Sequence, residues 1–236
     1  MTGNAVVIGA TGDVGRGIAK ALLADGYQVI AVGRTQGKLD ALRSDFPADA
    51  KMQTVVGSVA DEETGKAAAE RVLAFGAPQV VVTTVNGDTT PKPVFDLSTN
   101  EVGAALRDNV LTHYAAAKSF IPIIPTGGVY LGVGGGMADL IFPGMVALSM
   151  GQAALRNFYR FLAKDPACQS IHVRELMLYS IIAGKSNAGA VEPTWITDDE
   201  VGKHVSAILS NLDAFEGPIL TVKSRKQIGL PERKPQ

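Results

Sequence analysis

Short runs of β-branched and other apolar residues alternate with longer amphipathic stretches along the chain. The short runs predict seven strands, at residues 5–9, 28–32, 51–56, 79–84, 129–133, 170–178 and 218–222. The longer stretches predict helices at residues 14–25, 36–45, 61–75, 99–120, 142–164 and 197–211. Because strands that alternate with helices are joined by right-handed crossovers, the pattern predicts an α/β fold with a doubly wound, seven-stranded parallel sheet flanked by helices.

Local residue chemistry marks several of these boundaries. Thr197 and Glu200 have the spacing of a capping box at the start of the last helix, and Gly26 and Gly76 stand where two helices should end. No internal repeat or low-complexity tract divides the chain. We therefore predict that residues 1–236 form a single domain, with a polar, proline-containing C-terminal tail at residues 224–236.

Composition and charge narrow the classes of partner. Hydrophobic residues make up 46% of the chain and charged residues 19%, enough apolar surface for a sheet covered on both faces. The 22 basic and 23 acidic residues are scattered and give a net charge of −1, so we expect a small-molecule partner, with no nucleic acid and no membrane. Cys168 is the single cysteine, and the first strand begins close to Met1 without room for a signal peptide, so we expect a cytoplasmic protein.

A glycine-rich loop joins the first strand to the first helix. Gly9, Gly12 and Gly15 form a GxxGxxG pattern in this strand–turn–helix context. We expect Gly9 and Gly12 to adopt positive φ and let a pyrophosphate approach the backbone, and Gly15 to let the helix pack close to the sheet. An ordinary tight turn is the alternative. The loop predicts a Rossmann-type dinucleotide site whose residues are Gly9, Thr11, Gly12, Asp13, Val14, Gly15 and Arg16.

The end of the second strand indicates which dinucleotide binds. An NAD site favours a carboxylate there for the ribose 2′-hydroxyl, whereas an NADP site favours a cation for the 2′-phosphate. The strand ends in Gly33, Arg34 and Thr35, without Asp or Glu, and Arg16 of the glycine loop could approach from the other side. Unless both arginines are merely solvated, NADP(H) is the expected cofactor.

These residues resemble the short-chain dehydrogenase/reductase family over essentially the whole chain. The stretch from Thr84 to Gly87 looks like a variant of the family's Asn-Asn-Ala-Gly segment, and Asn109 looks like the asparagine of its catalytic tetrad. The stretch from Tyr179 to Ile182 takes the place of the segment that holds the nicotinamide amide, and Ser58 replaces an aspartate beside the adenine. The resemblance adds Ser58, Val59, Asn86, Gly87 and Ile182 to the cofactor site, Asn109 to the catalytic site, and a homodimer or homotetramer as the assembly.

The family's chemistry is where this sequence departs from the resemblance. Aligning residues 152–155 with the usual Lys-Ala-Ala-Leu places Leu148 at the catalytic tyrosine and Gln152 at the lysine. The catalytic serine falls in the glycine run 134–136. None of the three replacements can supply the missing proton donor or positive charge. Tyr114 and Lys118 form a literal Tyr-x-x-x-Lys, but they follow the fourth strand, in a helix that forms oligomer contacts in the family.

Few residues remain to carry a reaction. Tyr179 should lie near the nicotinamide and is the catalytic candidate beside Asn109, while Ser149 and Asp139 are further replacement acids. The three histidines have no metal-ligand spacing, so no metal site is expected. Because an iminium accepts hydride without forming an alkoxide, the sequence predicts an atypical NADP(H)-dependent oxidoreductase that reduces C=N or C=C bonds of a small organic substrate. The alternatives are a non-redox isomerase, lyase or cyclase on the same scaffold, and a non-catalytic NADPH-binding sensor or partner subunit.

Overall fold

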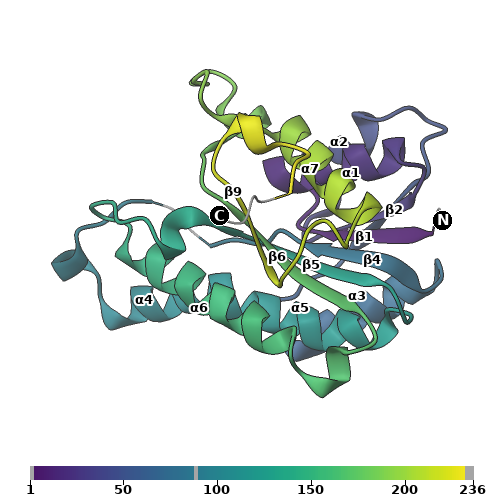
Figure 1. Ribbon diagram of the computed structural model, residues 1–236, viewed down its shortest axis with the longest axis horizontal. Coiled ribbons are helices and arrows are strands. Elements are labelled where there is room, and N and C mark those ends of the chain that lie inside the picture. Colours follow the sequence, from purple (N-terminus) through teal and green to yellow (C-terminus); the bar gives the residue numbers. More distant parts are fainter. Residues whose placement is uncertain (1–2, 88–89, 232–236) are drawn as a thin grey trace.

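The computed structural model describes residues 3–87 and 90–231, and its centre is a parallel sheet in the strand order β3-β2-β1-β4-β5-β6-β9 (Figure 1). The seven strands are β1 (Asn4–Ile8), β2 (Gln28–Gly33), β3 (Met52–Val56), β4 (Pro78–Thr83), β5 (Val129–Gly135), β6 (His172–Leu178) and β9 (Ile219–Val222). The predicted α/β class, the strand number and the parallel arrangement are confirmed. The order reverses direction between β1 and β4, which is where doubly wound sheets hold their ligands.

Helices cover both faces of the sheet (Figure 1). Their bounds are α1 (Asp13–Ala24), α2 (Gln36–Ser44), α3 (Glu62–Leu73), α4 (Thr99–Leu106), α5 (Thr112–Phe120), α6 (Val146–Leu162) and α7 (Asp198–Ser210). One apolar core joins the sheet to α1, α2 and α7, and the other joins it to α3, α5 and α6. The interiors of β1, β2 and β4 are buried on both faces, which explains why these strands read as nearly continuous apolar runs.

The predicted helix at residues 99–120 is interrupted. Its middle turn, Arg107–Leu111, is a π-helix between α4 and α5. Such wide turns are rare and frequently stand at functional sites. Asn109 lies in this turn. The apolar period continues through the interruption, so the sequence pattern does not reveal it.

A second, two-stranded parallel sheet was not predicted. It pairs β7 (Ile182–Ala183) with β8 (Ile196–Thr197), between β6 and α7. Two residues are too few to show a strand period, so this element left no signal. Three expected helix boundaries are confirmed. Gly26 and Gly76 have φ of +89° and +100° just after their helices, and Thr197 forms the capping box with Glu200.

Near the end of the described chain, Gly229 donates its backbone N–H to Nδ1 of His204 on α7 at 3.0 Å. Within the predicted tail, residues Arg225–Gln227 form a 3-10 turn, and residues 232–236 lie outside the described part of the chain. Of the helices within residues 3–87 and 90–231, none is both long and apolar enough to cross a membrane.

Candidate dinucleotide and substrate site

A cavity of about 560 Å³ opens at the carboxyl ends of the central strands. Its walls come from segments far apart in the sequence, which the parallel sheet brings to one edge. The lining residues follow β4 (Thr84, Val85, Asn86), end β5 (Val133–Met137), follow β6 (Leu178–Ile182), and belong to α1 (Val14), the π-helical turn (Asn109), the loop before α6 (Leu140, Phe142, Met145) and α6 (Leu148, Gln152, Leu155). The predicted residues Val14, Asn86, Asn109, Tyr179 and Ile182 are therefore brought together.

The glycine loop turns tightly between β1 and α1. Gly9 has φ +84°, and a Cβ there would lie 2.7 Å from the Thr84 hydroxyl oxygen. That hydroxyl donates to the carbonyls of Ile8, at 3.0 Å, and Gly9, at 3.2 Å, which ties β4 to the loop. A Cβ on Gly15 would lie 2.3 Å from the Gly9 carbonyl oxygen. Gly15 therefore permits the close approach of α1 to the sheet that was expected.

Gly12 corrects one expectation. Its φ is −80° and its ψ is 166°, which is extended backbone that any residue adopts, so the predicted positive φ is wrong. The turn is already made at Gly9, whose carbonyl accepts the Gly12 N–H at 3.1 Å. Gly12 is the N-cap of α1, without a side-chain cap, and the nearest atom to a Cβ there would be the Gly9 carbonyl oxygen at 3.6 Å. The N–H groups of the first helical turn are thus left for an outside acceptor.

The basic side chains near the glycine loop differ in whether they have an ion-pair partner. Arg34 is exposed directly after β2 and has no hydrogen-bond or ion-pair partner among the residues that the structure describes. Arg16 instead forms an ion pair with Asp45, whose carboxylate also lies 3.5 Å from the ammonium of Lys185. Thr35 is the N-cap of α2 and has no side-chain cap bond. Of the described residues Arg16, Arg34 and Lys185, Arg34 is therefore the one without an ion-pair partner.

Other predicted cofactor residues surround this region. Thr11 packs its methyl group near Gly33, and the Ser58 hydroxyl accepts the Ala60 N–H at 3.1 Å beside the buried Val59. Asp13 accepts hydrogen bonds from the backbone N–H of Ser186, at 3.2 Å, and from its hydroxyl. The loop that follows β7 is thereby attached to the start of α1.

The amide side chains of Asn109 and Gln152 line the cavity, and we call them its polar floor. Asn109 is 2% exposed and donates from its Nδ2 to the Ala105 carbonyl at 2.8 Å. A Cβ on Gly87 would lie 2.7 Å from this same nitrogen, which explains the glycine there. The buried Oε1 of Gln152 has no hydrogen-bond partner among the described residues. An unpaired buried acceptor is costly, so Gln152 is suited to receive a donor from a bound molecule.

The glycine run at the end of β5 makes room for side chains from other elements. A Cβ on Gly134 would lie 2.2 Å from the Glu175 carboxyl, and one on Gly135 would lie 2.7 Å from the Gln152 amide. A Cβ on Gly136 would lie 2.5 Å from the Tyr179 ring. Three polar side chains from other elements therefore fill the space that the glycine run leaves.

Tyr179 lines the cavity, and a hydrogen bond to Asp139 fixes its side chain. Its hydroxyl donates to the Asp139 carboxylate, which also pairs with Arg156. Hydrogen bonds from Arg156 and then from Tyr179 hold the pKa of Asp139 below its usual range, so this carboxyl is ionised. The Lys223 ammonium lies 5.3 Å from the centre of the Tyr179 ring. Ser149, the other replacement acid, is not among the residues that line the cavity.

The remaining tyrosines near α6 do not face the cavity. Tyr130 and Tyr159 are both 0% exposed, and burial raises the pKa of each. The Tyr159 hydroxyl contacts Nδ1 of His113 at 2.9 Å, and Nε2 of His113 contacts the Val85 carbonyl at 3.0 Å. Burial lowers the pKa of His113 to about 4, so the imidazole is neutral and its Nε2 carries the proton. Tyr159 therefore donates to Nδ1 and supports the segment after β4.

The literal Tyr-x-x-x-Lys pair lies on the outer side of α5. Tyr114 is 45% exposed and packs its ring 5.8 Å from that of Phe158. Lys118 pairs with Glu62 of α3 at 2.6 Å. Neither residue lines the cavity.

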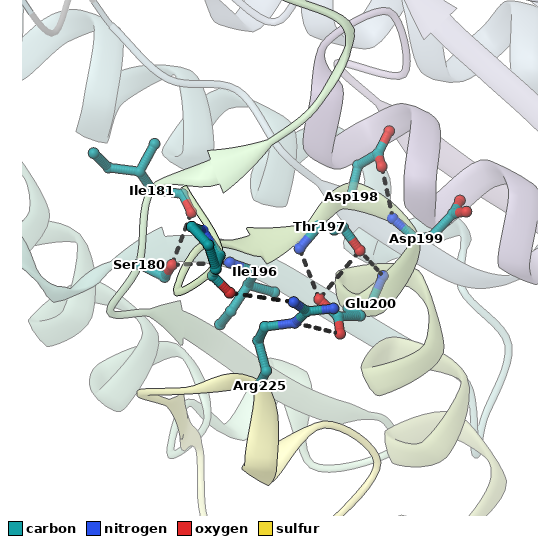
Figure 2. A network of polar contacts seen from close by, with 9 residues as sticks. Ser180, Ile181, Ile196, Thr197, Asp198, Asp199, Glu200 and Arg225 are labelled. Carbon is teal, nitrogen blue, oxygen red and sulfur yellow. Dashed lines mark hydrogen bonds and ion pairs between the residues drawn. The ribbon is translucent and has the colours of Figure 1, made fainter. Parts of the chain in front are cut away.

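Residues 179–197, which we call the strap, connect β6 to α7, and the first residues of the strap line the cavity. Figure 2 shows the polar contacts that hold the strap in place. The Ser180 hydroxyl donates to the Ile181 carbonyl at 2.7 Å and accepts the Ile196 N–H at 3.1 Å, which joins the two ends of the strap. Arg225 donates to Glu200 at 2.8 Å and to the Pro193 carbonyl at 3.2 Å. Hydrogen bonds therefore hold the strap both where its two ends meet, at Ser180 and Ile196, and at Pro193.

A protein-family model and curated proteins match most of this sequence. The family model described as short chain dehydrogenase matches residues 3–187. An uncharacterized oxidoreductase of Mycobacterium tuberculosis is 30% identical over 183 residues, which are 75% of this chain and 69% of that protein. A very-long-chain 3-oxoacyl-CoA reductase of Scheffersomyces stipitis is 23% identical over 195 residues, and the match spans 77% of this chain but only 56% of the reductase.

Solved structures share the fold. An alcohol dehydrogenase from the archaeon Thermococcus sibiricus, complexed with 5-hydroxy-NADP, superimposes with a TM-score of 0.82 at 21% identity, covering 100% of both chains. A 7α-hydroxysteroid dehydrogenase complexed with NADH and 7-oxo glycochenodeoxycholic acid has a TM-score of 0.81 at 18% identity, covering 93% of this chain and 92% of that one. At these identities the likeness establishes the architecture.

Proposed function

We propose that this chain, which belongs to the short-chain dehydrogenase family, is an atypical NADP(H)-dependent oxidoreductase that acts on a small organic substrate. Oxidoreductases of this family bind a nicotinamide cofactor. The observation that carries the finer proposal is the cavity at the reversal of strand order, which Leu148 and Gln152 line and where the buried amide oxygen of Gln152 has no hydrogen-bond partner among the described residues.

The residues present fit a dinucleotide along the loop and the cavity. The pyrophosphate would meet the free N–H groups at the start of α1, close to Gly12 and Val14. The exposed and uncommitted Arg34 would bind a 2′-phosphate through a charge-assisted, bidentate contact. A carboxylate that would select the 2′-hydroxyl is missing at this strand end. These features favour NADP(H) over NAD(H).

The nicotinamide half would lie in the cavity. The orphaned Oε1 of Gln152 would accept a hydrogen bond from a ribose hydroxyl, in the place of the lysine that the family resemblance implies. Asn86, Asn109 and Ile182 border the same space. The cofactor would supply a hydride, and the protein's part is to position the acceptor carbon beside it.

Leu148 and Gln152 also define the chemistry that we propose. Neither can give a proton to an alkoxide, and Tyr159, seven residues beyond Gln152, is buried against His113. The Tyr179 hydroxyl already donates its proton in a hydrogen bond to the ionised Asp139, so it is committed as a fixed donor on that side. We therefore propose C=N or C=C reduction, without the family's serine–tyrosine–lysine set. An iminium that gains a hydride becomes a neutral amine and needs no proton. An enone that gains a hydride at its β-carbon becomes an enolate, which is less basic at oxygen than an alkoxide and takes its proton at the α-carbon from water.

Single-turnover absorbance at the nicotinamide band tests this proposal. The purified protein is loaded with one equivalent of NADPH and mixed in parallel with panels of cyclic iminiums, enones and simple ketones. We expect oxidation of NADPH with a member of the iminium or enone panel and none with the ketones. Bound NADPH that no panel consumes would favour a non-redox or sensor role, and rapid ketone reduction would show that a proton donor exists in the site.

A further inference from the structure

One part of the cavity lining, which we call the apolar wall, is made of apolar side chains. Met137, Leu140, Phe142, Met145 and Leu148 line it, all from the end of β5, the loop before α6 or the first turns of α6. Of the described residues that line the cavity, none has the side chain of Asp, Glu, Lys, Arg or His. A charged group buried against this wall would therefore lose its hydration without gaining an ionic partner.

The apolar wall continues out to the protein surface. Leu140 is 38% exposed, Ile141 is 94% exposed and Phe142 is 55% exposed, in the loop that leads into α6. Ile181, which lines the cavity from the strap, is 58% exposed. A contiguous apolar surface that leads into a cavity is the usual mark of a ligand-binding groove. Here it extends the binding surface beyond the polar floor at Asn109 and Gln152.

We infer that the substrate is a molecule with a bulky, uncharged hydrocarbon portion, whose only polar group is the one that reacts. This inference rests on the proposed function for the position of the reacting bond, beside Gln152 and Tyr179. The hydrocarbon portion lies along Met137, Leu148 and Phe142 and reaches the exposed loop. Each methylene buried there improves binding by about 0.8 kcal/mol, a factor of about four in affinity. A carboxylate or ammonium on that portion prevents it from entering.

Isothermal titration calorimetry on the protein saturated with NADP⁺ tests the inference without turnover. The probes are butan-2-one, hexan-2-one and octan-2-one, which cannot take hydride from the oxidised cofactor, and 7-oxooctanoate as the charged counterpart of octan-2-one. We expect affinity to rise about fourfold for each added methylene. We expect 7-oxooctanoate to bind at least about thirtyfold more weakly than octan-2-one, because its carboxylate finds no partner.

Two variants locate the effect. Phe142→Ser removes apolar surface from the wall and should weaken octan-2-one about tenfold or more, with butan-2-one changed less. Phe161→Ser is the control, because Phe161 is 70% exposed near the other end of α6 and does not line the cavity. An affinity that is independent of chain length, tight binding of 7-oxooctanoate, or equal losses in both variants would overturn the inference. If NADP⁺ itself fails to bind, the proposed function fails, and the same ketone series on the protein alone still decides the substrate class.

Discussion

The carboxyl of Glu175 makes a quantitative prediction about pH and stability. It lies on β6 with 0% exposure, and neither of its oxygens has a hydrogen-bond partner among the described residues. Burial raises its pKa to about 8 from 4.5, against a smaller opposing effect of Arg156. The folded protein therefore keeps Glu175 neutral at pH 7, whereas the unfolded chain ionises it. Its contribution to stability is complete below pH 4.5 and is lost as the pH rises toward 8.

The size of this loss follows from the two pKa values. They differ by about 3.5 pH units (8 minus 4.5), and each unit is worth about 1.4 kcal/mol, so the free energy of unfolding falls by at most about 5 kcal/mol across that range. Glu175→Gln keeps the shape and removes the titration. We expect the variant to be about 2–5 kcal/mol more stable than the parent protein at pH 8, and the difference to vanish near pH 4.5.

Urea unfolding followed by circular dichroism at pH 5, 6, 7 and 8 measures this difference. Glu70→Gln is the matched control, because Glu70 is exposed on α3 and should show no pH-dependent gain. A Glu175→Gln variant that is less stable than the parent at pH 8 would refute the reasoning, since it would mean that the carboxylate is ionised and paired in the folded protein. A gain that is constant with pH would refute it as well.

Three further variants test the glycine loop, the hydrogen bond between Tyr159 and His113, and the alignment of α6 with the family's catalytic helix. Gly15→Ala places a methyl group 2.3 Å from the Gly9 carbonyl oxygen, so we expect NADP⁺ affinity to fall at least about tenfold by calorimetry, whereas Gly37→Ala, with no atom within 4 Å of the added methyl, should leave it unchanged. Tyr159→Phe leaves its buried imidazole partner without a hydroxyl and should cost about 1–3 kcal/mol in urea unfolding, and an unchanged midpoint would contradict the hydrogen bond. The double variant Leu148→Tyr with Gln152→Lys should gain NADPH-dependent ketone reduction, and no gain would speak against the alignment of α6.

Much of the fold could be predicted because its signals are local. Short runs of β-branched and other apolar residues marked all seven strands of the main sheet, and Gly26, Gly76 and Thr197 marked helix ends by their own backbone or side-chain chemistry. The β7–β8 pair escaped, since two residues carry no periodicity. The conformation of Gly12 was also missed, because the positive φ at Gly9 alone completes the turn.

The site was predictable only where its residues follow strands in sequence. The glycine loop and Tyr179 were predicted in this way, because the carboxyl ends of parallel strands meet at one edge, whereas Asn109 was predicted from the family resemblance. Glu175 was missed, since it reads as one more position in a buried strand and only the fold shows that it covers Gly134. The pairing of Arg16 with Asp45 was missed for the same reason: the two residues are far apart in the sequence and only packing brings them together.

We propose that the site binds NADP(H) through Arg34. Calorimetric titration of NADP⁺ and NAD⁺, at one fixed salt concentration, into the parent protein and Arg34→Ala tests this contact. We expect the parent to bind NADP⁺ at least about tenfold more tightly than NAD⁺. The variant should lose about 1.5–3 kcal/mol toward NADP⁺, a factor of roughly 10 to 150, while its affinity for NAD⁺ stays within about twofold. Equal losses for the two nucleotides, or a parent protein that prefers NAD⁺, would contradict the account.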